Sequence, residues 1–402
     1  MRRTFLALGA LHLLWAATYA FIMPVGKAPD EPSHFKYVKF VATKLRLPLY
    51  DDPEVGHESQ QPPLHYFLSA PVFLLTSPLG ETAQNRALRL FASLLGLGTL
   101  YLTLLTASLL GLSKWGKWAA GLWVGLLPHM LLVSAMVNND STTTLTVTAG
   151  VTTLTWVALL GPSTVRALIC GMATGLALAS KQTGLLLLPL WPLAWAVGAK
   201  KAGLTPRTAI KSFALGAIIA TIVPLPWFVR NLWLYGSLYL YAAHPYDHSL
   251  LDLLSAPKFL LELLWIITRD TYRTFWAEKV WFPEALAPWL VGGFSFALLI
   301  GVYGWLKRPR AGPEWLVPLG ALLLGLLGLY RFNLFISIGA HQGGKYLMPV
   351  LPCFALLWAK GGEALPSGAR NWALAGLFTL LLVANIVSAF NIVTYLNVVY
   401  GG

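Results

Sequence analysis

Apolar runs alternate with short polar segments along the whole sequence, up to about residue 395. The runs at about 5–23 and 90–112 are long enough to cross a bilayer, because a membrane-spanning helix needs about 20 apolar residues. Two shorter runs, at 167–179 and 185–197, flank a polar turn. They predict a hairpin that leaves Lys181 in a cavity at or below the membrane surface. The pattern predicts an all-α polytopic membrane protein, one domain over residues 1–402 with about 11 transmembrane helices.

The composition supports this class. Hydrophobic residues make up 56% of the 402 residues and charged residues only 11%, whereas a soluble domain carries about 25% charged residues. The net charge of +13 comes from cations that punctuate the apolar runs, so it implies phospholipid or a phosphorylated lipid as partner and no nucleic acid. Cys170 and Cys353 lie inside apolar runs and are expected to be unpaired core thiols.

Two longer segments, 24–89 and 230–287, are expected to be outer loops. In the first, residues 32–46 combine an apolar stripe with lysines, which is typical of a helix that lies in the membrane interface with its apolar face toward lipid. The apolar run at 64–76 is too short to cross and predicts a second interfacial helix. The second loop is rich in Trp, Tyr and charge.

The charges divide the loops into two sides. Short loops on one side collect Lys and Arg, and Glu314 and Glu363 are the acidic residues among them, out of 16 in the chain. Positive charge marks cytoplasmic loops, so Arg2 and Arg3 place the N-terminus in the cytoplasm. We therefore expect a multi-pass protein of the cell (inner) membrane, with its active site on the outer or periplasmic face.

Asp30 and Glu31 stand between Pro29 and Pro32, shortly after the first crossing. A helix that begins near Pro32 would favour ionised carboxylates at its N-terminus. One of the two acids can then act as the catalytic base for an acceptor hydroxyl. A capped surface helix is the plain alternative, and the sequence does not rank Asp30 against Glu31.

Other candidates lie near the ends of crossings. Asp140 is a second acidic group, for metal or acceptor binding, with a helix cap as the alternative. Lys181, Arg230 and Lys345 could bind a lipid phosphate, or could be snorkelling side chains that anchor the crossings. Further loop candidates are His34, Gln61, Arg269, Arg273 and Tyr346.

Three histidines of the first loop, His34, His57 and His65, could bind a metal. Their spacing does not match a zinc site, which favours interfacial polar residues instead. No cofactor is assigned, and a divalent cation such as Mg²⁺ or Mn²⁺ stays open. Carboxylates, cations and a lipid-facing helix on one side suggest group transfer from a lipid-phosphate donor, since the leaving phosphate needs cations and the acceptor needs a base.

Six short motifs occur in an order that resembles GT-C glycosyltransferases. They are Asp30-Glu31, the stretches 61–64 and 86–90, Asn139-Asp140, and the stretches 180–184 and 226–231. The branch that the chain resembles includes the protein O-mannosyltransferases and the lipid A aminoarabinose transferases. The stretch 342–349 is similar to the Gln-Gly-Arg-Tyr-Leu-Leu-Pro signature of a poorly characterised bacterial membrane family in this superfamily. Lys345 stands where arginine is usual, with an extra glycine before it.

The resemblance implies a polyprenyl-phosphate-sugar donor, an inverting mechanism and catalysis by the first acidic motif. The acceptor could be a glycan, a glycolipid or a protein. A polymerase or ligase of lipid-linked glycans is the nearest rival interpretation. A transporter of lipid-linked or small solutes is the rival from another class, and it would be expected to show paired repeats and ionisable residues at mid-membrane.

Overall fold

The computed structural model of the chain describes residues 1–240, 249–277, 288–307, 310–336 and 343–400. Within these ranges the regular elements are α-helices and short 3₁₀ helices, and no strand occurs. The expected all-α fold is confirmed. The predicted second loop, 230–287, falls only partly within the described ranges, and Gln342 of the C-terminal signature lies outside them.

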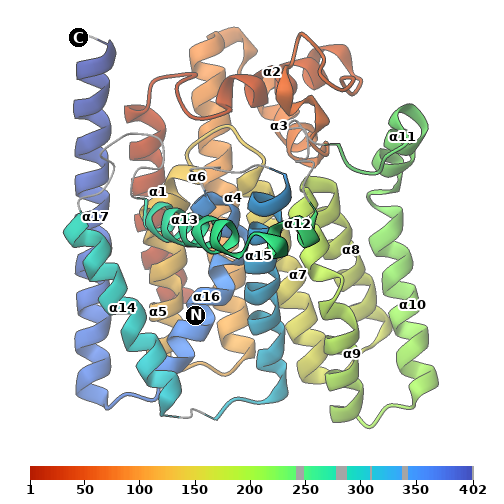
Figure 1. Cartoon of the computed structure of the whole chain (residues 1–402), viewed down its shortest axis with the longest axis vertical. Coiled ribbons are helices and arrows are strands. Elements are labelled where there is room, and N and C mark those ends of the chain that lie inside the picture. Colours follow the sequence, from red (N-terminus) through yellow and green to blue (C-terminus); the bar gives the residue numbers. More distant parts are fainter. Residues whose placement is uncertain (241–248, 278–287, 308–309, 337–342, 401–402) are drawn as a thin grey trace.

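Most helices run along the long axis of the molecule and form one bundle (Figure 1). They are α1 (Arg2–Ile22), α4 (Glu81–Leu109), α5 (Lys114–Leu126), α7 (Asp140–Leu160), α8 (Thr164–Ser180), α9 (Leu190–Lys201), α10 (Pro206–Ile222), α14 (Pro288–Leu306), α15 (Leu316–Phe335), α16 (Leu351–Gly362) and α17 (Ser367–Tyr400). Among the described residues, seven helical spans are long and apolar enough to cross a membrane. The pair α10 and α11 (Leu225–Tyr235), bent by 56°, would make an eighth. The protein is thus a multi-pass membrane protein, and the number of 11 crossings stays a prediction.

Two short helices of the first loop, α2 (Glu31–Lys44) and α3 (Leu64–Leu75), cover one end of the bundle, which we call the site end (Figure 1). The helix ends next to Lys114, Arg166 and Lys201 lie at the opposite end. The fold therefore separates basic short loops from the long first loop, in agreement with the charge pattern. The direction in which the bundle sits in its membrane stays a prediction.

The apolar face of α2 does not point toward lipid as expected. Phe35 and Val38 are buried in a cluster with Tyr66 and Phe73 of α3, and the Phe35 and Phe73 ring centroids lie 5.7 Å apart. The expectation was wrong because amphipathicity shows that a helix has a buried face but does not show what covers it. On α3, in contrast, Leu68, Leu74 and Leu75 are exposed, as expected for an interfacial helix.

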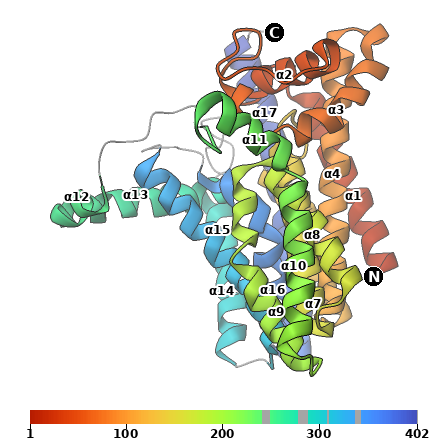
Figure 2. The ribbon, with the colours of Figure 1, turned by 90° about the vertical axis from the view of Figure 1, so that its right-hand side faces the viewer.

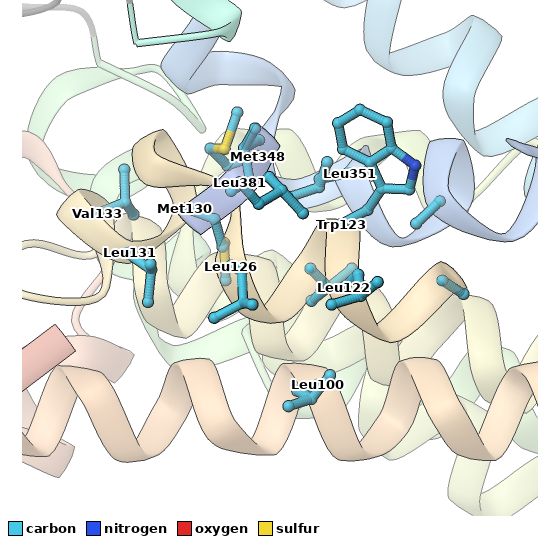
Figure 3. Close-up of a cluster of buried hydrophobic side chains, with 14 of the residues drawn as sticks. Leu100, Leu122, Trp123, Leu126, Met130, Leu131, Val133, Met348, Leu351 and Leu381 are labelled. Atoms are coloured by element: carbon cyan, nitrogen blue, oxygen red, sulfur yellow. The ribbon is translucent and has the colours of Figure 1, made fainter. Parts of the chain in front are cut away.

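The largest buried cluster surrounds Trp123 of α5, beside α6 (Pro128–Val133). Figure 3 shows Trp123 close to Leu122 and Leu351. Its ring also lies 5.6 Å from that of Trp276 and 5.7 Å from that of Trp358, measured between centroids. This aromatic packing fastens the segment after α13 (Pro257–Phe275) to the middle of the bundle. Cys170 and Cys353 are buried free thiols, as predicted.

Candidate active site

A cavity of about 640 Å³ lies at the site end, between the first loop, η3 (Gln182–Leu187), α15 and η5 (Gly343–Val350). Its charged and hydrogen-bonding side chains come from segments far apart in the sequence. Those central to the site are Asp30, His34, His57, Glu58, Gln61, Asp140, Lys181, Arg331, Lys345 and Tyr346. The fold therefore gathers most of the predicted site residues into one space.

Asp30 is the N-cap residue of α2 and has φ 60° and ψ −7°, in the left-handed region. A non-glycine residue is uncommon there, although aspartate tolerates it better than most. The carboxylate bridges two cations: Oδ2 accepts from the Lys345 ammonium at 3.2 Å, and Oδ1 lies 3.3 Å from His57 Nε2. The Asp30 side chain is still 37% exposed, so the cavity gives it access to a substrate.

Glu31, in contrast, is fully buried and its two oxygens are occupied. They accept from Arg89 Nε at 2.8 Å and Nη2 at 2.6 Å, and from the backbone N–H groups of Gly26 and Val137 at 3.1 Å. Arg89 also donates to the carbonyls of Ala20 and Met23 at the end of α1. This buried ion pair joins α1, α2 and α4 directly beside Asp30.

Asp140 begins α7 and accepts from the Lys181 ammonium at 2.5 Å. Lys181 is the C-cap residue of α8, at the turn of the predicted hairpin. The neighbouring Asn139 donates to the side-chain oxygen of Gln61 at 3.0 Å, which ties α7 to the first loop. The predicted second acid and first lysine therefore form an ion pair that lines the cavity.

Lys345 reaches the cavity from η5, whose two glycines pack directly against α13. The Gly344 N–H donates to Thr274 Oγ1 at 2.9 Å, and a Cβ on Gly344 would lie 2.2 Å from the backbone nitrogen of Phe275. The ammonium groups of Lys181 and Lys345 lie 5.8 Å and 5.5 Å from the centroid of the Tyr346 ring. Burial acts to lower the pKa of Lys345, but the neighbouring Tyr346 and the carboxylates of Asp140 and Asp30 raise it above the usual range, so the amine stays charged.

His57 and Glu58 begin η1 (His57–Gln60) and complete the acidic side of the cavity. His57 Nε2 lies 3.3 Å from Glu58 Oε1, and this contact, with Asp30 nearby, raises the pKa of His57 to about 9. Burial would raise the pKa of Glu58, but the imidazoles of His34 and His57 and the ammonium of Lys181 lower it to about 2. One ligand atom from each of Asp30, His57 and Glu58 lies within 4.8 Å of the others, so these three residues could hold a metal ion.

The other predicted loop residues divide between the cavity and its surroundings. His34 and Gln61 line the cavity, and His34 Nδ1 pairs with the Tyr66 hydroxyl at 2.9 Å. His65 is buried and pairs with Thr142 at 2.8 Å. Neither histidine belongs to the metal-binding group found among the described residues.

Three predicted arginines do not line the cavity in the part of the chain that the structure describes: Arg230, Arg269 and Arg273. Arg230 donates to the Pro48 carbonyl at 2.5 Å, and its guanidinium lies 5.3 Å from the centroid of the Trp227 ring. Arg269 donates to the neighbouring Asp270 at 2.8 Å. The contacts of Arg230 fasten α11 to the first loop.

Sequence reasoning missed three residues, one of which is Glu58, described above. Arg331 of α15 lines the cavity as a third cation, but in the sequence it is only a charge near the end of an apolar run. Arg89 is fully buried in α4. In the sequence Arg89 closes the predicted first loop, 24–89, one residue before the crossing, so its burial and its pairing with Glu31 are visible only in the fold.

No protein-family model and no curated protein matches this chain. Several solved structures match its fold. ArnT from Cupriavidus metallidurans bound to undecaprenyl phosphate matches with a TM-score of 0.55 and 16% identity, over 98% of this chain and 76% of that one. The Archaeoglobus fulgidus oligosaccharyltransferase in complex with zinc and sulfate matches with a TM-score of 0.52 and 13% identity, over 96% of this chain and 53% of that one.

Arabinofuranosyltransferase AftD from Mycobacteria is a third match, with a TM-score of 0.56 and 16% identity, over 97% of this chain and 26% of that one. The chain therefore has the fold of the GT-C membrane glycosyltransferases, as its motifs predict. At these identities the likeness establishes the fold alone.

Proposed function

We propose that the protein is a membrane glycosyltransferase that moves a sugar from a polyprenyl-phosphate donor to an acceptor hydroxyl, with inversion at the anomeric carbon. The observation that carries this proposal is the make-up of the cavity, which joins a charged end to an apolar wall. The acceptor belongs to a glycan, a glycolipid or a protein. The site end would face the outer or periplasmic side of the cell membrane.

The apolar wall suits the donor's hydrocarbon chain. It consists of Leu185 and Leu186 of η3 and of Leu324, Gly328 and Phe332 of α15. Both elements belong to candidate membrane spans, so a polyprenyl chain could lie against them while its phosphate reaches the charged end. The match to a structure that holds undecaprenyl phosphate supports this assignment.

The charged end suits the leaving phosphate. Lys181, Lys345 and Arg331 all line the cavity, and cations that are fixed in place before reaction stabilise a departing phosphate. In the structure both lysines are paired with carboxylates, Lys345 with Asp30 and Lys181 with Asp140. A donor phosphate would draw the Lys345 ammonium toward itself, which would leave Asp30 paired with His57 alone and better able to accept a proton.

We assign the base to Asp30 and a positioning role to Glu31. The oxygens of Glu31 are held by Arg89 and two backbone N–H groups, whereas Asp30 is partly exposed in the cavity. In the reaction, the acceptor hydroxyl gives its proton to the Asp30 carboxylate and its oxygen attacks the anomeric carbon. The bond from that carbon to the phosphate oxygen breaks, and the polyprenyl phosphate leaves with the electron pair.

A divalent cation fits this site as well. Two carboxylates and an imidazole are a donor set that borderline metals accept, and Asp30, His57 and Glu58 bring such atoms together. A cation bound there would supply positive charge beside the transferred group. His57 would have to lose its proton to bind it, so metal binding would strengthen as the pH rises.

The proposal is tested with purified protein in liposomes and a panel of synthetic polyprenyl-phosphate sugars. Transfer of one labelled sugar to a hydroxyl acceptor supports it, and added chelator then decides whether a metal is required. Mass spectrometry of the purified protein should detect a bound polyprenyl phosphate. Transport of a solute without transfer of any sugar would refute it.

A further inference from the structure

Figure 2 shows α12 (Leu250–Ser255) and α13 extending sideways out of the bundle, across the direction of the spans. Near its C-terminal end, α13 touches two spans: Thr268 pairs with the Tyr330 hydroxyl of α15 at 2.7 Å, and Tyr272 pairs with Ser295 of α14. Tyr330 lies five residues before the end of α15, and Ser295 lies seven residues after the start of α14. At a rise of about 1.5 Å per residue, α13 therefore crosses roughly 8–10 Å inside the ends of these helices.

The surface of this arm is strongly amphipathic. Lys258, Glu262, Arg269 and Arg273 follow one line along α13, because steps of four and seven residues return to the same side of a helix. Large apolar side chains of the arm are exposed outside that line. They are Leu251 (76%) and Leu254 (56%) of α12 and Phe259 (50%) and Leu261 (67%) of α13, whereas the exposed Trp265 lies at the edge of the line itself, seven residues after Lys258.

We propose that α12 and α13 form an arm that lies in the lipid leaflet at the site end, with its charged line toward the headgroups and its apolar side chains among the acyl chains. The reason is that α13 contacts α14 and α15 inside the ends of these spans, and not beyond them. These spans themselves expose Phe296, next to Ser295, and Leu327, about one turn from Tyr330, so lipid surrounds them at the level where α13 leaves the bundle. A helix with a narrow charged line and bulky apolar flanks is the kind that lies in the interface of a bilayer.

The arm also reaches the cavity. Thr274 near the C-terminal end of α13 accepts the hydrogen bond from Gly344, and Lys345 follows directly in the chain. If α13 is fixed in the leaflet, its hydrogen bond to Gly344 would also fix the position of the segment that carries Lys345. This inference goes beyond sugar transfer, and its test does not depend on an active donor.

The test compares neighbouring positions on the same helix turn. Leu261→Cys and Glu262→Cys are each labelled with a nitroxide; Cys170 and Cys353 are buried and remain unlabelled. In phosphatidylcholine–phosphatidylglycerol nanodiscs, collision rates with oxygen and with a water-soluble nickel chelate are measured. The label at 261 should collide severalfold more with oxygen than with nickel, and the label at 262 should show the opposite preference. Phe259→Cys and Lys258→Cys provide a second pair if either first variant fails to fold.

Equal preference for nickel at both positions of a folded pair would place the arm in water and overturn the proposal. A label at 261 or 259 that is shielded from both reagents would also overturn it, because a protein partner would then cover this face. A failed sugar-transfer assay leaves these results unaffected, so the two proposals can fail separately.

Discussion

Glu31 is buried and paired, whereas the adjacent Asp30 is partly exposed, and this difference gives the sharpest prediction on stability. Glu31→Gln leaves the Arg89 guanidinium fully buried without its negative partner. Removing one partner of a buried ion pair costs about 3–5 kcal/mol, and we expect about 3 kcal/mol because the glutamine amide oxygen still accepts one hydrogen bond. Asp30→Asn removes contacts of a partly exposed carboxylate, so it should cost about 1 kcal/mol or less.

The assay is unfolding of both variants and the parent protein under matched conditions in the same detergent, by denaturant and by heat. A second variant, Arg89→Leu with Glu31→Leu, replaces the pair by apolar groups and should recover part of the loss, because no unpaired charge remains. The reasoning would be refuted by a Glu31→Gln protein as stable as the parent. It would also be refuted if Asp30→Asn were the more damaging substitution for stability.

Three further predictions concern Lys345, the glycine before it and His57. Lys345→Ala should lower kcat/KM by roughly 2–4 kcal/mol in free-energy terms, with partial recovery in Lys345→Arg; equal activity of the alanine variant per folded protein would exclude Lys345 from the site. Gly344→Ala should displace η5 from α13 and lower kcat, whereas Gly376→Ala, with nothing near its new Cβ, should not; equal loss in both would contradict the close packing. Because the pKa of His57 is raised from 6.5 to about 9, its stabilising charge is present below pH 6.5 and is lost as the pH rises through 9. The parent should therefore lose roughly 1 kcal/mol relative to His57→Gln over that window, after allowance for a half-exposed side chain; parallel pH profiles would contradict this.

Much of the bundle could be predicted from sequence because a bilayer fixes the length and polarity of each crossing. The positive-inside rule, in turn, assigned the basic short loops and the long first loop to opposite ends. The apolar pattern could not show what covers each apolar face. The apolar face of α2 packs against α3. That pairing depends on the path of the loop between the two helices, and this loop has no periodic pattern of apolar residues from which its path could be predicted.

The site was partly predictable for a related reason. Charges at the ends of spans can also be caps or anchors, but Asp140, Lys181 and Lys345 lie in the short motifs quoted above, so they stood out, and the fold brings them together. The choice between Asp30 and Glu31 could not be made, because it depends on the distance from Glu31 to Arg89, 58 residues away in the chain. Arg230 carries the same charge as the lysines, but the structure places it outside the cavity, where it donates to the Pro48 carbonyl and lies over the Trp227 ring.

Sugar transfer by Asp30→Asn and by the parent protein, measured side by side in liposomes, tests the central claim most directly. The donor is the polyprenyl-phosphate sugar that the panel identifies. Donor binding is measured separately, as the amount of labelled donor retained by the purified protein in detergent. We predict that the variant binds the donor as the parent does and transfers no sugar above background, because the acceptor proton has no base to take it. A folded Asp30→Asn protein that transfers sugar at the parent's rate would contradict the account.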